Sequence, residues 1–207
     1  MVEAPPPAPA SDVAPQVTRG QSSIYTILEL TRELRQSEIL TNLVEYSFEL
    51  GEGSTIAVAT TTHDFAIVLT QDCDLLWDYD AAKKGEPPEL NGVLMYELEP
   101  ADQARAKIKG KDIWKRMRQN RDERYHFLEA VPAASDACSQ GLPDMILDFK
   151  KCFTLPAPEI YRQLGLKDGV KRRCRLETPY REHLQSRAAY YLQRVMLPLP
   201  HQPSADI

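Results

Sequence analysis

Residues 44–50 read VEYSFEL, so apolar and polar side chains alternate at every position of this stretch. This period of two predicts a half-buried strand of an antiparallel sheet. A Gly-rich turn at 51–54 and a β-branched, Ala-rich segment at 55–62 follow, and they predict the second strand of a hairpin. After a break at 63–64, the apolar run 65–70 is expected to form a central strand that is covered on both faces.

The order of the remaining elements sets the fold class. Further strands are expected at 93–98, 125–128 and 145–149, loops at 77–92 and 132–143, and helices at 22–34, 100–121 (with Gly110 as an interruption), 158–164 and 179–195. The strands follow one another without βαβ alternation, and neither GxGxxG nor GxxxxGK(S/T) occurs. The sequence therefore predicts an α+β fold with a small antiparallel sheet or SH3-like β-barrel, peripheral helices and a C-terminal helix.

Length and composition predict one domain with short extensions. The 207 residues are enough to bury a proper core, and we expect a single α+β domain at 20–200. Residues 1–19 are rich in Pro and Ala and are expected to be a disordered tail, and residues 201–207 a C-terminal tail. No apolar run approaches the roughly 18 residues of a membrane span, and no signal peptide is evident. We therefore expect a cytoplasmic protein without membrane association.

Charge is distributed unevenly along the chain. Residues 1–100 hold 17 acidic and 5 basic side chains, whereas residues 101–207 hold 13 acidic and 20 basic ones. Two faces of one domain that complement each other would explain this polarity, and we prefer that interpretation. The alternative is a basic surface for nucleic acid or for an acidic partner.

Unusual chemistry is concentrated where the apolar run 65–70 ends. The candidate catalytic residues are Thr70, Asp72, Cys73 and Asp74, with His63 and His126 as the histidines that the fold would have to bring in. Cys73 would need a nearby His or cation to act as a nucleophile, because neighbouring carboxylates raise the pKa of a thiol. The alternative is structural, with Cys73 packed inward and the two Asp capping a turn or pairing with the basic half.

The same cluster is the candidate metal site. Asp72, Cys73 and Asp74 could hold zinc or another divalent metal, but no HExxH and no closely paired Cys supports such a site. We therefore expect no metal and no other cofactor. The four cysteines, at positions 73, 138, 152 and 174, are widely spaced and are expected to be reduced thiols in or near the core.

Two basic segments are candidate binding surfaces. The first contributes Lys107, Lys111, Trp114, Lys115, Arg116 and Arg118, and the second contributes Arg172, Arg173 and Arg175. The first segment could neutralise phosphates while Trp114 stacks on a base. Alternatively, Ile108, Trp114 and Met117 form a buried stripe below a solvated face, and the second segment pairs with Asp72, Asp74, Asp78 and Asp80.

Two motifs carry a resemblance to a bacterial family. Residues 36–40 read QSEIL and residues 67–75 read IVLTQDCDL. They resemble the patterns RQGDIL and VLSQ(D/T)CD(I/L) of uncharacterised bacterial proteins, and residues 173–198 are similar to the C-terminal end of those proteins. The resemblance covers most of residues 34–198. Such proteins often accompany defence or other mobile gene clusters, which implies a role that depends on a partner.

A second resemblance is to the SH3-like barrel of MazF/PemK-type toxins. Glu38-Ile39 and Val68-Leu69-Thr70 are similar to two of its strands. Only Thr70 maps onto the catalytic hydroxyl position of those ribonucleases, and no Arg of their motif maps onto this chain. The resemblance thus implies a barrel but not the nuclease activity.

Three functional hypotheses follow. The first is a non-catalytic accessory subunit of a bacterial multi-protein system, such as anti-phage defence, with a larger protein as partner. The second is a nuclease or metal-dependent hydrolase that uses the Asp72-Cys73-Asp74 cluster. The third is an RNA-binding module that uses the basic residues without cleavage.

Overall fold

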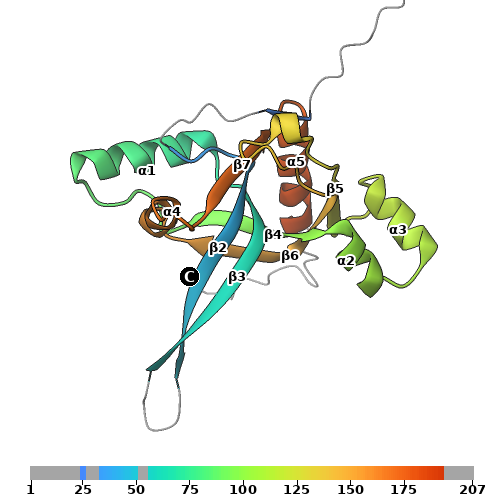
Figure 1. Ribbon diagram of the computed structural model, residues 1–207, viewed down its shortest axis with the longest axis horizontal. Helices are drawn as coiled ribbons and strands as arrows, with labels where there is room; N and C mark the ends of the chain where they lie inside the picture. Colours follow the sequence, from blue (N-terminus) through green and yellow to red (C-terminus); the bar gives the residue numbers. More distant parts are fainter. Residues whose placement is uncertain (1–23, 27–32, 51–55, 194–207) are drawn as a thin grey trace, which may run out of the picture.

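The computed structural model describes residues 24–26, 33–50 and 56–193 of the chain (Figure 1). Within these residues, seven antiparallel strands form one sheet in the order β1-β7-β2-β3-β4-β6-β5. The sheet curls like half of a barrel, and five α-helices lie around it (Figure 1). The predicted α+β fold with an antiparallel sheet, peripheral helices and a C-terminal helix is therefore confirmed, and the sheet is a seven-stranded half-barrel.

Each strand pairs antiparallel with its neighbours in the sheet. They are β1 (Tyr25–Thr26), β2 (Glu38–Leu50), β3 (Ile56–Val68), β4 (Val93–Pro100), β5 (Tyr125–Leu128), β6 (Met145–Leu155) and β7 (Lys171–Leu176). The hairpin predicted from the alternating stretch is β2–β3, but both strands are longer than expected. β3 continues through His63 and Asp64, so the predicted break there is wrong.

The helices are α1 (Asp72–Lys84), α2 (Ala101–Lys107), α3 (Lys111–Arg118), α4 (Ala157–Leu164) and α5 (Tyr180–Leu192), with a 3₁₀ turn at Ala133–Ser135. Gly110 separates α2 from α3 as predicted, and its φ of 117° is one that residues with a Cβ rarely adopt. The predicted α4 and the start of α5 are also confirmed. The helix expected at 22–34 lies mostly outside the described residues, and Tyr25–Thr26 is a strand.

The loop predicted at 77–92 is wrong in its first half, because α1 occupies residues 72–84. Asp72 and Asp74 lie in its first turn and Lys83 and Lys84 in its last, as the helix dipole favours. Gly85 ends the helix in the left-handed conformation. The helix buries only a narrow stripe, and Asp78 in that stripe accepts hydrogen bonds from the backbone of the following loop.

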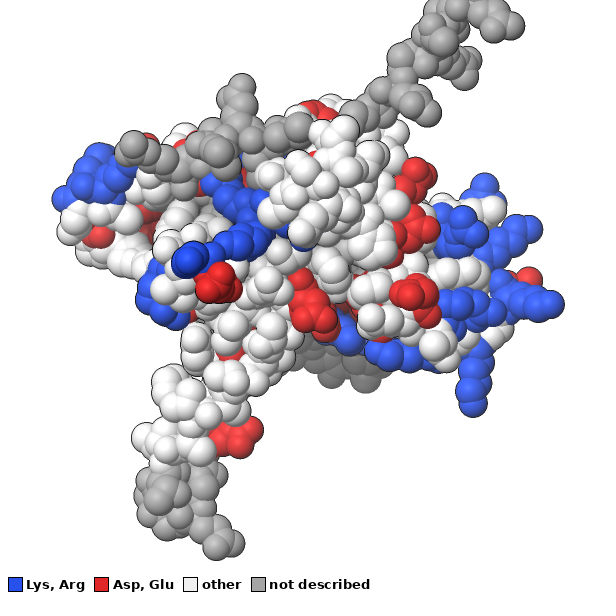
Figure 2. All heavy atoms as spheres, viewed as in Figure 1, with Lys and Arg blue, Asp and Glu red and all other residues white. Residues whose placement is uncertain are grey.

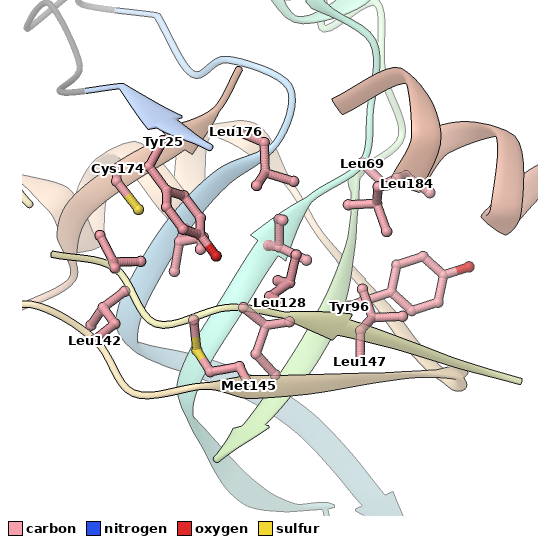
Figure 3. Packing of buried hydrophobic residues seen from close by; sticks show 14 of the residues in the cluster. Tyr25, Leu69, Tyr96, Leu128, Leu142, Met145, Leu147, Cys174, Leu176 and Leu184 are labelled. Carbon is pink, nitrogen blue, oxygen red and sulfur yellow. The ribbon is translucent and has the colours of Figure 1, made fainter. Parts of the chain in front are cut away.

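Both faces of the sheet are covered where the strands lie in the body of the protein. Ile39, Ile67 and Tyr96 pack in one core cluster with Leu184 and Ala188 of α5. Figure 3 shows Tyr96 and Leu184 in this cluster. Their strand neighbours point the other way, since side chains alternate across a sheet. Leu40, Ala66, Val68 and Met95 pack with Leu75 of α1 and Ile160 of α4. A third cluster joins α2 and α3 to β5 and β6. The central strand predicted at 65–70 is covered on both faces, but it ends at Val68.

A tyrosine connects the two ends of the curled sheet. The hydroxyl of Tyr25 in β1 donates a hydrogen bond of 2.5 Å to the backbone carbonyl of Glu129, which follows β5. Burial raises the pKa of Tyr25, so the hydroxyl stays protonated as a donor. The two edge strands are thus linked although no backbone ladder joins them among the described residues. The tails predicted at 1–19 and 201–207 lie outside those residues.

Candidate functional site

The carboxylate of Asp72 is the centre of a charged network at the start of α1. Its Oδ1 accepts hydrogen bonds from the backbone N–H of Gln36 at 2.7 Å and from Nε of Arg35 at 3.2 Å. Its Oδ2 faces Arg175, with which it forms an ion pair, and lies 3.4 Å from Nη1 of Arg181. Asp72 therefore joins α1 to β7 and α5, and the structural alternative for this residue is confirmed.

The other members of the cluster are not assembled into a catalytic centre. Thr70 Oγ1 accepts a hydrogen bond of 2.7 Å from the backbone N–H of Leu94 and so belongs to the β3–β4 junction. Cys73 is exposed, and its thiol contacts Gln71 and Asp74. The expectation that Cys73 packs inward is wrong, because α1 directs this position to solvent. Of the four thiols only Cys174 is buried, so the expectation of core thiols is also wrong for the exposed Cys73 and Cys152.

The two candidate histidines lie elsewhere in the sheet. His63 of β3 stacks on Phe153 with ring centroids 3.9 Å apart, and its Nε2 lies 3.1 Å from Glu45 of β2. His126 lies in the edge strand β5, with its ring 5.4 Å from that of His183 in α5. Neither imidazole contacts Cys73. Among the described residues no three Cys, His, Asp or Glu side chains come together as a metal site.

His126 is a buried and neutral group. Burial, together with the nearby Arg187 and His183, lowers its pKa to about 3. Its Nδ1 is buried without a hydrogen-bond partner in the described structure. Arg187 lies beside it and donates hydrogen bonds to the backbone carbonyls at positions 120, 122 and 125. These bonds thus connect α5 to the segment before β5 and to the first residue of β5.

The Arg-rich segment predicted as a contact surface is the strand β7. Arg172 pairs with the fully buried Glu38, and Arg173 pairs with the buried Asp136 at 2.6 Å. Arg175 pairs with Asp72. Arg173 holds the pKa of Asp136 well below its usual range. The three arginines thus pair inside the fold, as in the alternative, but of the four aspartates expected as partners only Asp72 is used, and Glu38 and Asp136 are the other two partners.

The basic segment 105–124 does lie on the surface. Figure 2 shows Lys and Arg side chains gathered over α2 and α3. Four of its cations have partners: Arg105 bonds the Ile108 carbonyl, and Lys107, Arg116 and Arg124 pair with Glu99, Asp122 and Asp148. Five have no ion pair with any described residue, namely Lys109, Lys111, Lys115, Arg118 and Arg121. The structure therefore leaves a positive surface here.

Trp114 packs partly into the protein. It is partly buried against the cluster of Met117 and Phe127, and the Arg105 guanidinium lies 5.6 Å from the centre of its ring. The alternative in which Ile108, Trp114 and Met117 form a buried stripe agrees with this packing.

A second surface feature is an arm, defined as residues 44–50 of β2 and 56–62 of β3, which projects from the body (Figure 1). Phe48 lies opposite Val58, and Tyr46 lies opposite Thr60, so these side chains share one face. Phe48 is 76% exposed, Val58 60%, Ile56 68% and Tyr46 44%. The arm therefore presents large apolar side chains to solvent.

At the base of the arm, a side chain takes the place of a neighbouring strand. The side-chain amide of Gln163 in α4 accepts from the Val44 backbone N–H at 2.9 Å and donates to the Val44 carbonyl at 2.7 Å. It thereby takes the place of a neighbouring strand where β7, which pairs with β2 only up to Thr41, has ended. A cleft of about 620 Å³ lies here, lined by Val44, Tyr46, Gln163 and Leu166 among others.

Part of the arm has a signal in the sequence. The alternation at 44–50 implied one apolar face, but it could not tell whether that face would be covered. No Lys, Arg or Pro occurs from 43 to 62, and this absence of edge-protecting residues was readable from the sequence. Gln163 gave no signal, because its partner lies 119 residues away.

Comparison of the chain with known protein families, curated proteins and solved structures finds no match. None of the described helices is long and apolar enough to cross a membrane.

Proposed function

We propose that this protein is a non-catalytic interaction subunit that docks onto a larger partner protein through its β2–β3 arm. The observation that carries the proposal is the exposed apolar face of the arm, with Phe48 and Val58 at its centre. A two-stranded hairpin is marginally stable in water when no other element covers it. A face with these side chains gains stability when a partner buries it.

The backbone N–H and C=O groups along the outer edge of β2 favour docking by strand addition. The N–H and C=O of Val44 point away from β3 towards Gln163. Because backbone groups alternate along a strand, those of Tyr46 and Phe48 point to the same edge, which β7 does not reach. An extended segment of the partner can continue the sheet there by strand addition.

The chemistry of the arm favours a partner segment that is apolar and flanked by Lys or Arg. The arm carries Glu45 and Glu49 and no basic residue, so its charge is complementary to such flanks. A second copy of this chain is a poorer fit. A strand of seven residues is about 23 Å long, so two arms packed face to face would bury roughly 230 Å² each, well below the ~800 Å² per partner of stable interfaces.

The alternatives draw less support from the site. The hydrolase hypothesis needs Asp72, but that carboxylate is engaged by Arg35, Arg175 and Arg181. The resemblance to proteins near bacterial defence clusters agrees with an accessory role, so we place the subunit in such a multi-protein system.

The test compares two variants in a reconstituted complex. The native partner is captured from the host with the wild-type protein, identified by mass spectrometry and purified. Phe48→Thr/Val58→Thr places β-branched residues of high strand propensity at both positions but removes the apolar face. We expect its affinity to fall by at least about 30-fold, since central apolar anchors contribute roughly 2 kcal/mol or more. Trp77→Ser removes an equally exposed side chain from α1 and is the matched control.

The outcomes are distinct. Loss of the 1:1 complex in the arm variant, with the Trp77 variant unchanged, supports the proposal. Equal binding by all three proteins refutes the arm as the docking element. Self-association of the wild-type chain that disappears in the arm variant would make a second copy the occupant and would overturn the larger partner.

A further inference from the structure

We propose that the α3 face and the cleft beside it bind single-stranded nucleic acid. We define the α3 face by Lys111, Lys115 and Arg118, and the cleft by Arg116, Arg121, Arg124, Lys150 and Tyr191. The two surfaces are continuous through α3 and the segment that follows it. This activity does not depend on the docking arm, which lies at another end of the molecule (Figures 1 and 2).

The first argument is uncompensated charge. Lys111, Lys115 and Arg118 are spaced by four and three residues, so they lie on one side of the helix. All three are exposed and none has an ion pair with a described residue. The opposite side of α3 is fixed in the core by Met117. The helix therefore presents a stripe of cations whose orientation the fold determines, and binding of a phosphate backbone would release counterions there.

The second argument is the cleft, which has a volume of about 710 Å³. Arg121 and Lys150 line it, and neither has an ion pair within the described structure. Arg124 is held by Asp148, and Arg116 lies 3.9 Å from Asp122. Asp122 and Glu123 also line the cleft, so its charge is mixed and the free cations are at Arg121 and Lys150.

The third argument is the aromatic wall. Tyr191 of α5 lines the cleft, and its ring stacks on the buried Phe149 with centroids 5.6 Å apart. A ring held in this way offers a fixed surface for a base. Cationic grooves with aromatic walls are typical of proteins that bind single strands with little sequence preference. A duplex keeps its bases stacked inside, so the cleft favours an unpaired strand.

The negative charge elsewhere on the protein directs a polyanion to the α3 face. The chain is acidic overall, with a net charge of −5, and no Lys or Arg occurs between residues 36 and 82. A polyanion is therefore repelled from the arm and attracted to the α3 face, which fixes the position of binding.

The experiment is fluorescence anisotropy with labelled 12-nucleotide RNA, DNA and duplex DNA at several salt concentrations. About five released counterions predict a slope of log K against log salt near −3.5 for single strands. Affinity should then fall roughly 100-fold between 50 and 200 mM NaCl. We expect the single strands to bind at least tenfold more tightly than the duplex.

Three variants locate the site. Lys111→Ala/Lys115→Ala should reduce the slope by about 1.4, because two phosphate contacts are lost. Arg121→Ala/Lys150→Ala should remove the preference for single strands. Lys83→Ala/Lys84→Ala alters exposed cations of α1 and should change neither quantity. The arm variant Phe48→Thr/Val58→Thr should bind nucleic acid as the wild type does, which separates this proposal from the docking proposal.

Several outcomes would overturn the inference. Absence of binding at 50 mM salt, or an equal loss in the Lys83/Lys84 variant, would show that the α3 face is not the site. Equal affinity for duplex and single strands would exclude the role of the cleft. Tighter binding of an acidic peptide such as polyglutamate would make the surface a protein contact instead.

Discussion

The buried imidazole of His126 makes the protein sensitive to mild acid. Its pKa is lowered from 6.5 to about 3, because burial and the nearby Arg187 and His183 disfavour the charged form. The unfolded chain binds a proton near pH 6.5, whereas the folded chain does not. The stabilisation is thus fully present above pH 6.5 and is lost as the pH falls from 6.5 towards 3.

The magnitude follows from the two pKa values. The free energy of unfolding is expected to be about 2 kcal/mol lower at pH 5 than at pH 8, since one pKa unit corresponds to about 1.36 kcal/mol. The groups that face the ring are His183 and Arg187 of α5, with Arg118 and Glu129 around the same small cavity. His183 also has a pKa lowered by burial, so it adds to the loss in the same direction.

Urea denaturation of the wild type and of His126→Phe at pH 8 and pH 5 measures the effect. The substitution keeps an aromatic ring beside Phe149 and removes the titrating group. We expect the variant to lose about 2 kcal/mol less than the wild type between the two pH values. A wild type whose free energy of unfolding is unchanged at pH 5, or a variant with the same pH dependence, would refute the reasoning.

Three further substitutions test the structural roles assigned above. Asp136→Asn should lower the free energy of unfolding by about 3–5 kcal/mol, because it leaves Arg173 buried without a carboxylate, and a loss below 1 kcal/mol would contradict the pair. Gln163→Leu should cost about 1–3 kcal/mol and speed amide exchange at Val44, whose backbone groups lose their partner; unchanged exchange would count against the strand-like role. Cys73→Ser should shift stability by less than about 0.5 kcal/mol, and a large fall in melting temperature would show that the thiol is packed after all.

The sheet was predictable where local pattern decides the structure. The alternation at 44–50 defined the β2–β3 hairpin, and Gly110 marked the division between α2 and α3. The helix α1 was missed, since only Leu75, Asp78 and Ala81 are buried and one of the three is polar. Its acidic first turn, basic last turn and Gly85 were available signals, and they describe the helix better than its apolar periodicity does.

The candidate site was less predictable, because its partners are distant in sequence. Arg172 and Glu38 are 134 residues apart, and Arg175 and Asp72 are 103 apart. A single sequence shows such arginines as a run of charge and does not show which carboxylate each one meets. The same limit applies to Phe48, because the sequence cannot reveal that its face of the hairpin extends beyond the body.

The uneven charge of the chain has two physical origins. One part is internal: Glu38 and Asp72 of the acidic half pair with Arg172 and Arg175 of the basic half, and these pairs help to hold β7 and α1 in place. The other part stays on the surface, as an acidic and apolar arm and a cationic α3 face at different ends of the molecule (Figure 2). Paired charges are not available to a ligand, whereas these two surfaces are. The two proposals are therefore compatible, since a strand bound at the α3 face would leave the arm open to a partner.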